Sequence, residues 1–321
     1  MPRQRSFVTG ADGFVGGFLL EHLAEEGDEL LGAVPQSLRE SPGVPDVLRK
    51  TPLVVWDLAD PSCDDEAVRN TLLQFRPNAI YHLAAISVPE DCGDTSVRPL
   101  AQVVNVQGTA RLLRLAIDLP EPPRVLIVSS SYVYPSPDRP RPCSEDGPIA
   151  PRRGYGRTKR EAELLALQAW QEHGLPVVIA RAFPHTGPRQ SRRMMLPEWA
   201  AQFAAGVNPV RVHTLDAWID LSDVRDVVRA YRRLVERGAA GEVYNVGSGV
   251  SRRSGDVFEL LRQIADPKRD VQEIRPGPKS DPIANITKIL RAVGWQPKIP
   301  LDQTVRDTWE YWRKVEATGT G

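Results

Sequence analysis

The chain has 321 residues, 41 Lys and Arg against 41 Asp and Glu, and an apolar content of 41%. This composition is typical of a soluble globular protein with one large domain or two modest ones, and it excludes a chain that is mainly disordered. A net charge of zero gives no reason to expect nucleic acid or an anionic membrane as the partner, so a small ligand is favoured.

The apolar runs, such as 53–55 and 125–128, are far shorter than the roughly 18 residues of a membrane span. The amino terminus leads into a strand pattern and not into an apolar signal core, so we expect a cytoplasmic protein. The three cysteines, Cys63, Cys92 and Cys143, have no metal-ligand spacing and are odd in number. We therefore expect reduced thiols and no metal site.

Short apolar runs alternate with helical patterns through the first half of the chain. Strands separated by helices indicate right-handed crossovers and a parallel sheet with helices on both faces, which binds ligands at the carboxyl ends of its strands. The expected elements are strand 7–9, helix 14–26, strand 54–56, helix 64–75, strand 79–83, helix 97–117, strand 125–129, helix 155–173 and strand 177–180.

Beyond residue 184 the alternation gives way to segments rich in Pro and Arg. The expected elements there are helix 223–236, strand 243–246, and helices 254–264 and 301–315. We predict an α/β fold: a Rossmann-type doubly wound parallel sheet with a smaller, interleaved C-terminal substrate domain. Residues 1–183 would form the dinucleotide-binding domain, with 214–248 returning to it, and residues 184–213 and 249–321 would form the substrate domain.

Three glycines, Gly10, Gly13 and Gly16, follow the first predicted strand and open a helix. Glycines there allow a tight turn and a close approach of the backbone to a pyrophosphate, which the free N–H groups and the dipole of the helix N-terminus stabilise. A glycine triplet also occurs in ordinary loops. Its place between a strand and a helix favours the dinucleotide site.

Tyr155 and Lys159 are four residues apart at the start of a predicted helix, so they share one face. A lysine ammonium near a phenol favours the tyrosinate, as a proton-transfer tyrosine requires. Ser129, Ser130 and Ser131 end the preceding strand, where a hydroxyl can hydrogen-bond a substrate oxygen. The alternative interpretation is an exposed helical pair and an ordinary turn.

With these residues the sequence resembles the extended short-chain dehydrogenase/reductases, specifically their nucleotide-sugar epimerase, dehydratase and reductase group. The resemblance covers nearly the whole chain in order. The matching segments are Thr9-Gly10, Asp57-Leu58, 82–85, 105–109, Ser130 with Val133-Tyr134, Tyr155 with Lys159, 181–188, 223–226, 244–247 and 294–297.

The resemblance implies Tyr155 as the acid/base, Lys159 as its electrostatic partner and a ribose ligand, and Ser130 as the hydroxyl that polarises the substrate. It places Asp57 and Leu58 near the adenine. The full set of cofactor contacts that it implies is Gly10, Asp12, Gly13, Phe14, Val15, Gly16, Asp57, Leu58, Leu83, Ala84 (at the diphosphate), Ala85, Asn105 (in a helix behind the site), Ser129, Tyr155, Lys159 and Phe183.

The subtype depends on departures from the family pattern. Dehydratases of the family carry an acidic residue just after the catalytic hydroxyl, where this chain has Ser131 and Tyr132, which argues against a dehydratase. Segments 181–190 and 215–217 resemble the branch of the GDP-6-deoxy-4-keto-mannose reductases and GDP-mannose dehydratases. Pro184 and Ile219 replace an Asn and an Arg that normally touch the nucleotide diphosphate.

Arginines are able to compensate for these losses, because the guanidinium fork matches phosphate oxygens. Each arginine is alternatively a solvated surface charge. The expected substrate contacts are Ser131, Tyr132, Pro184, Arg189, Arg211 and Arg275, and Arg192 and Arg193 are further phosphate candidates.

The second strand ends at 31–37 without the acidic residue that would repel a 2′-phosphate, so we expect NADP or NAD with a preference for NADP. Arg39 is a candidate partner for the phosphate. His82 and His185 lie near the implied cleft, where we expect structural and not catalytic roles.

The leading hypothesis is an NAD(P)-dependent oxidoreductase or epimerase acting at C4 of a nucleotide-linked hexose, best the reduction of a GDP-linked 4-keto-6-deoxy sugar. The alternatives are a 4-epimerase or 4,6-dehydratase, a reductase of a non-nucleotide carbonyl compound, and a non-catalytic dinucleotide sensor. Related reductases pair two helices in a four-helix bundle, so we expect a homodimer through helices 105–118 and 155–173, whose leucines 112, 113, 115, 164, 165 and 167 occupy more than one face.

Overall fold

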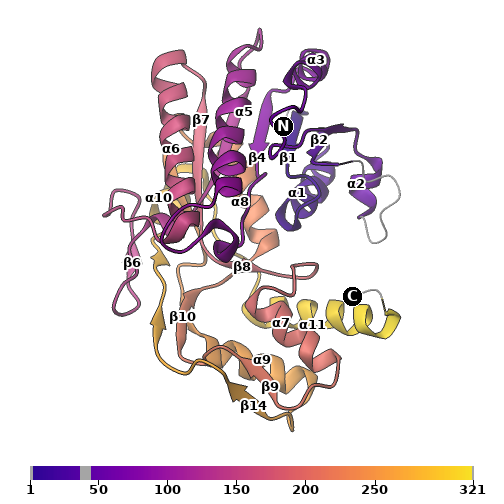
Figure 1. Cartoon of the computed structure of the whole chain (residues 1–321), viewed down its shortest axis with the longest axis vertical. Helices are drawn as coiled ribbons and strands as arrows, with labels where there is room; N and C mark the ends of the chain where they lie inside the picture. Colours follow the sequence, from indigo (N-terminus) through magenta and orange to yellow (C-terminus); the bar gives the residue numbers. More distant parts are fainter. Residues whose placement is uncertain (1–2, 37–44, 320–321) are drawn as a thin grey trace.

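The structure, a computed structural model, describes residues 3–36 and 45–319. Its central feature is a seven-stranded sheet whose neighbours are all parallel, in the order β12-β7-β5-β4-β1-β2-β3 (Figure 1). The order reverses between β1 and β4, which confirms the doubly wound sheet and places its ligand crevice at their carboxyl ends. The strands are β1 (Arg5–Thr9), β2 (Glu29–Val34), β3 (Leu53–Val55), β4 (Ala79–His82), β5 (Arg124–Ser130), β7 (Val177–Ala182) and β12 (Val243–Val246).

Helices cover both faces of this sheet because its strands alternate apolar side chains toward both sides. In β1, Phe7 packs among residues of the helices α3, α5 and α6, whereas Val8 packs among residues of α1, α8 and α10. These helices span α1 (Phe14–Glu25), α3 (Asp65–Phe75), α5 (Gly108–Ile117), α6 (Arg153–His173), α8 (Val224–Arg237) and α10 (Thr287–Val293), and the short α2 (Asp46–Lys50) lies on α1.

A second apolar core lies beside the carboxyl ends of the strands, where Trp199 packs edge-to-face on Phe258 with ring centres 5.5 Å apart (Figure 1). Its helices are α7 (Met195–Ala204), α9 (Ser254–Ala265) and α11 (Leu301–Thr318). Its strands form a sheet of order β13-β10-β15 and the pair β14-β9. They span β9 (Val210–Val212), β10 (Ala217–Asp220), β13 (Ser251–Arg253), β14 (Val271–Glu273) and β15 (Lys279–Ser280).

Two short parallel pairs join the two cores. They are β8 (His185–Thr186) with β11 (Ser222–Asp223), and β6 (Pro142–Cys143) with β16 (Ile283–Ala284). Strand β10 falls inside the segment 214–248 that was expected to return to the first domain, but it pairs within the second core. The domain boundaries themselves stay a prediction.

Several local features differ from the sequence-based expectation. The helix expected over 97–117 is interrupted, because α4 (Pro99–Ala101) passes into a π-helical segment, Gln102–Gln107, before α5 begins. Helix α7 was not expected at all in the Pro- and Arg-rich region. Among the described residues, none of the helices combines the length and apolar composition that crossing a bilayer requires.

Candidate active site

The structure brings Ser130, Tyr155 and Lys159 together. Ser130 ends β5, Tyr155 lies in the first turn of α6, and Lys159 follows one turn later. The Ser130 side chain lies close enough to the Tyr155 hydroxyl to act on the pKa of this phenol, and Lys159 Nζ lies 5.9 Å from the centre of the Tyr155 ring. Lys159 Nζ also donates to the carbonyl oxygen of Val128 at 2.9 Å, which fixes the ammonium group at the carboxyl end of β5.

Burial controls the charges in this cluster. It raises the pKa of Tyr155 above its ordinary value, and the hydrogen bond with Ser130 only partly opposes this, so the phenol holds its proton at neutral pH. Burial also lowers the pKa of Lys159 to about 8, although Cys92 and Glu163 act to raise it. The cluster therefore pairs a protonated phenol with an ammonium group that titrates just above neutral pH.

Aromatic and basic side chains frame Tyr155 on the side toward the second core. The rings of Tyr132 and Tyr155 meet edge-to-face with centres 5.6 Å apart, and the Arg152 guanidinium stacks 4.4 Å above the Tyr132 ring. Arg152 Nη1 donates to Asp281 Oδ1 at 2.8 Å, which links the start of α6 to the segment between β15 and β16. Ser131 is buried beside Tyr132.

Glu163 was not recognised from the sequence, yet it organises the back of the site. Its carboxylate is fully buried and accepts hydrogen bonds from Ser129 Oγ at 2.6 Å, from Arg181 Nε at 2.8 Å and from Arg160 Nη1 at 2.8 Å. Burial acts to raise the pKa of Glu163, but these hydrogen bonds outweigh it and hold the pKa below its ordinary value. Ser129, expected at the cofactor, is thus turned toward α6.

The glycine turn fits a dinucleotide. Gly10 has a positive φ of 66°, and a Cβ at Gly16 would lie 2.1 Å from the Gly10 carbonyl oxygen, so neither position accepts a side chain. Gly13 is the N-cap of α1 and no side chain caps this terminus, which leaves its N–H groups available to a diphosphate. Asp12 is exposed and Phe14 and Val15 are half-buried at the same helix end.

The segment after β4 is held by a chain of hydrogen bonds. Ala84 N donates to Thr9 Oγ1 at 3.2 Å, and His82 lies between Thr9 Oγ1 and Thr109 Oγ1 at 2.8 and 3.0 Å. Burial lowers the pKa of His82 to about 3, so its ring is neutral and structural. Leu83 and Ala85 flank Ala84 and are half-buried.

Asn105, in the π-helical segment, lies behind this loop. Its Oδ1 accepts from Ile86 N at 2.7 Å, and its Nδ2 donates to Thr158 Oγ1 at 3.0 Å. The Asn105 side chain therefore ties the loop after β4 to the helix that carries Tyr155.

The remaining predicted cofactor residues lie on the flanks of the crevice. Asp57 follows β3 and accepts from Ala59 N at 2.8 Å, and Leu58 is buried against Gly108. Phe183 is buried just after β7. Arg39 lies outside the described residues.

The predicted substrate residues are more scattered. Pro184 accepts a backbone hydrogen bond from Ser222, and Arg211 and Arg275 are exposed on the second core. Arg189 lies instead on α1, where both of its terminal nitrogens donate to the Glu21 carboxylate at 2.6 Å. It would have to leave this ion pair to bind a substrate. Arg193 likewise pairs with Asp91 at 2.7 Å.

His185 is also structural. Its Nδ1 lies 2.9 Å from the carbonyl oxygen of Phe183 and its ring stacks on Phe14 with centres 6.3 Å apart. Within residues 3–36 and 45–319, no three His, Cys, Asp or Glu side chains gather as a metal ion would require.

Replacing Gly13 by Val should weaken dinucleotide binding by more than tenfold without unfolding the chain. A Cβ at Gly13 meets only the Gly10 carbonyl oxygen at 3.1 Å, so the fold accommodates it with a small shift, but the side chain would crowd a bound pyrophosphate. Titration of NADPH and NADH by fluorescence quenching measures the affinity. Gly17→Ala is the control, because a Cβ there meets only Pro45 Cγ at 3.8 Å. Equal affinities in the Gly13 variant and the wild type would show that the cofactor lies elsewhere.

Comparison with known proteins agrees with this geometry. Residues 6–247 match the model of the NAD dependent epimerase/dehydratase family. A GDP-6-deoxy-D-mannose reductase from Pseudomonas aeruginosa is 31% identical over 96% of this chain and 97% of its own length. A dTDP-glucose 4,6-dehydratase from Haemophilus influenzae is 28% identical over 95% of this chain and 96% of its own length.

Solved structures give the same result. The structure of RMD from Pseudomonas aeruginosa complexed with NADPH superposes with a TM-score of 0.78 at 28% identity, covering 97% of this chain and 99% of that one. The chain therefore belongs to the NAD dependent epimerase/dehydratase family, and it is an NAD(P)-dependent enzyme of the extended short-chain dehydrogenase/reductase type.

Proposed function

We propose that the enzyme reduces the 4-keto group of a nucleotide-linked 6-deoxyhexose, with a GDP-linked sugar and NADPH as the preferred pair. The similarity to the GDP-6-deoxy-D-mannose reductase over nearly the full chain supports the substrate class. The NADPH in the structure of RMD and the absence of an acidic residue at the end of β2, over 31–36, support the cofactor.

The observation that carries the proposal is the protonated Tyr155 hydroxyl beside Ser130. When bound, a reduced nicotinamide supplies the hydride. Ser130 would donate a hydrogen bond to the substrate carbonyl oxygen, and Tyr155 would give that oxygen its proton as the alcohol forms. Lys159, charged below about pH 8, would stabilise the tyrosinate that remains.

The second candidate is a 4-epimerase, which would use the same three residues in both directions. Ser131 and Tyr132 at the positions after Ser130 supply no carboxylic acid for the elimination step of a dehydratase. The two candidates differ in cofactor balance, because a reductase consumes NADPH with each turnover and an epimerase does not.

The test follows NADPH oxidation at 340 nm with GDP-, dTDP-, UDP- and CDP-linked 4-keto-6-deoxyhexoses, and the product is identified by NMR. We expect stoichiometric oxidation and the fastest turnover with the GDP-linked sugar. Interconversion of C4 epimers without net oxidation would establish the epimerase instead. Turnover of simple carbonyl compounds, with none of the nucleotide-linked sugars reduced, would favour the non-nucleotide reductase that Pro184 and Ile219 leave open.

The rate of reduction should fall as the pH rises through about 8. Lys159 has its pKa lowered to about 8, so above this pH it is neutral and no longer stabilises the Tyr155 oxyanion. A profile of kcat/KM between pH 6 and 10 measures the alkaline limb. Lys159→Arg should move this limb to higher pH because the guanidinium stays charged, and Lys159→Met should lower the rate and abolish the limb. An unchanged profile in both variants would contradict the coupling between Lys159 and Tyr155.

We also propose a homodimer through α5 and α6. The structure leaves a smaller apolar surface on these two helices than the sequence suggested. Leu112, Leu113 and Leu115 are all buried within the chain itself, because α5 packs on the sheet with one side and against α6 with another. These three leucines therefore offer little apolar surface to a second copy. The surface that remains is a groove of about 450 Å³ between the two helices, lined on α6 by Leu165, Gln168 and Glu172, and Leu164 is half exposed on α6 outside this groove.

Light scattering at micromolar concentration should give twice the 35.6 kDa of one chain. Leu164→Glu should halve that mass, because it places a charge on the exposed apolar position. Glu316→Gln, exposed on α11, is the control and should leave the mass unchanged. A wild-type mass of a single chain would show that α5 and α6 cover only their own sheet.

A further inference from the structure

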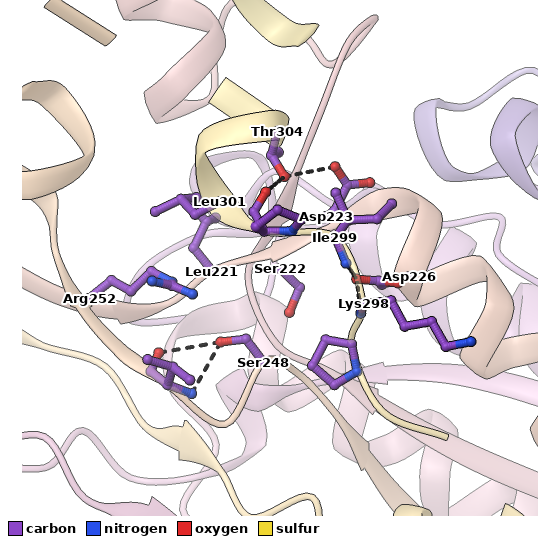
Figure 2. Close-up of a pocket in the computed structure, with 13 residues that line it drawn as sticks. Leu221, Ser222, Asp223, Asp226, Ser248, Arg252, Lys298, Ile299, Leu301 and Thr304 are labelled. Atoms are coloured by element: carbon purple, nitrogen blue, oxygen red, sulfur yellow. Dashed lines mark hydrogen bonds between the residues drawn. The ribbon is translucent and has the colours of Figure 1, made fainter. Parts of the chain in front are cut away.

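A second pocket lies apart from the cluster of Ser130, Tyr155 and Lys159. It has a volume of about 280 Å³ and is bordered by β11, β13 and the first turn of α11 (Figure 2). Ser222 of β11 and Arg252 of β13 extend into the space beneath Leu301, the first residue of α11. None of the proposed catalytic side chains lines it.

Two hydrogen-bond donors in this pocket have no partner among the described residues. Ser222 is only 4% exposed, and its hydroxyl makes no hydrogen bond. The Nε of Arg252 is buried and equally unpaired, and no carboxylate within residues 3–36 and 45–319 forms an ion pair with this guanidinium. Buried donors are nearly always satisfied in native proteins, and these two are free to donate to an acceptor that enters the pocket.

The helix that borders the pocket adds to its positive potential. Helix α11 is 18 residues long, starts directly after Pro300, and has no side chain that caps its first N–H groups. The unpaired N–H groups and the dipole of such a terminus favour an anion.

Each of the two carboxylates at the edge of the pocket is paired with an arginine, which offsets its negative charge. Asp223 binds Arg225 Nη2 at 2.7 Å and Thr304 Oγ1 at 2.8 Å. Asp226 accepts from the backbone N–H groups of Lys298 and Ile299, each at 2.8 Å, and pairs with Arg229. The side chain of Lys298 points away from the pocket (Figure 2). Among the described residues that line the pocket, Arg252 is thus the cation that extends into it without an ion pair.

We propose that this pocket binds the oxygens of a phosphate group, which Arg252 would hold with its planar fork and Ser222 with its hydroxyl. The phosphate group has two possible sources, the diphosphate of the nucleotide-linked substrate and a free phosphate ion. The proposal is independent of the reduction step, because it concerns no reacting atom.

The test compares Arg252→Met and Ser222→Ala with the wild-type protein by calorimetric titration of inorganic phosphate, pyrophosphate and GDP. We expect Arg252→Met to weaken binding at least tenfold and Ser222→Ala about threefold, since charged hydrogen bonds contribute more than neutral ones. Arg253→Met is the matched control, because the neighbouring Arg253 is exposed and pairs with Asp216, and it should bind as the wild type does. Arg252→Lys should recover part of the affinity, because it keeps the charge and loses the fork.

Competition between inorganic phosphate and GDP identifies which molecule supplies the phosphate group. If phosphate displaces GDP, and Arg252→Met weakens both equally, the pocket holds the diphosphate of the substrate. If phosphate binds without displacing GDP, the pocket is a separate phosphate site. Unchanged affinity for all three ligands in Arg252→Met, Arg252→Lys and Ser222→Ala overturns the proposal, as does a wild-type protein that binds none of them. Wild-type NADPH oxidation is measured beside these titrations, so a failure of the proposed reduction is recognised separately.

Discussion

Tyr155→Phe should lower kcat for reduction by about a thousandfold while NADPH affinity changes less than twofold. The substitution removes the hydroxyl that lies beside Ser130 and leaves the ring, which keeps its edge-to-face contact with Tyr132 at 5.6 Å between ring centres. General acid catalysis by a positioned side chain contributes between about 10² and 10⁴ in rate. A thousandfold loss corresponds to about 4 kcal/mol of transition-state stabilisation.

Steady-state kinetics on the preferred sugar measure kcat, and fluorescence titration measures the affinity for NADPH. Tyr132→Phe is the matched control, since it deletes a phenol hydroxyl from the neighbouring ring and should cost less than tenfold. A Tyr155→Phe enzyme that retains more than a tenth of the wild-type kcat would remove Tyr155 from the role of proton donor.

Glu163→Ala should lower the free energy of unfolding by about 3–5 kcal/mol, the cost of leaving a buried charge without its partner. Both oxygens of Glu163 accept from Arg181, at 2.8 and 2.9 Å, and both side chains are almost completely buried. Deleting the carboxylate strands the Arg181 guanidinium and frees the Ser129 hydroxyl. Urea unfolding followed by circular dichroism measures the change.

Glu172→Ala on the exposed side of the same helix should change stability by less than about 0.5 kcal/mol, as is usual for surface positions. The ion pair between Glu163 and Arg181 also makes the stability of the folded protein depend on pH in the acid range. Because the pKa of Glu163 is lowered in the folded protein, its contribution is complete above about pH 4.5 and is lost as the pH falls through the lowered value. A Glu163→Ala protein as stable as the Glu172→Ala control would show that the pair contributes nothing net.

Individual helices and strands were predictable because their turn residues and apolar periodicity are visible within a short stretch of sequence. Helix α1 begins at Phe14, as its glycine turn and its apolar face predicted, and β5, α6 and β7 lie within a few residues of the expected ranges. The closeness of Ser130, Tyr155 and Lys159 follows from one strand end and one helix start. Their catalytic roles stay predictions until the variants are measured.

The rest depends on contacts between distant segments, which one sequence does not reveal. The hydropathy of α6 marks Glu163 only as a polar residue on a buried face, and its partner Arg181 arrives from β7. Arg189 looks like a phosphate ligand until Glu21 of α1, 168 residues away, is placed beside it. Helix α7 is stabilised by Trp199 against Phe258 of α9, so its own sequence pattern gave no clear signal.

The ion pair between Arg152 and Asp281 has a consequence for turnover. Arg152 immediately precedes α6 and Asp281 belongs to the segment that connects the two cores, so any movement of the second core away from Tyr155 must break this contact. A product that needs such an opening to escape would leave at a rate set partly by the strength of one ion pair. Since both side chains are largely shielded from solvent, added salt would weaken it little, and release would stay nearly constant across ionic strengths.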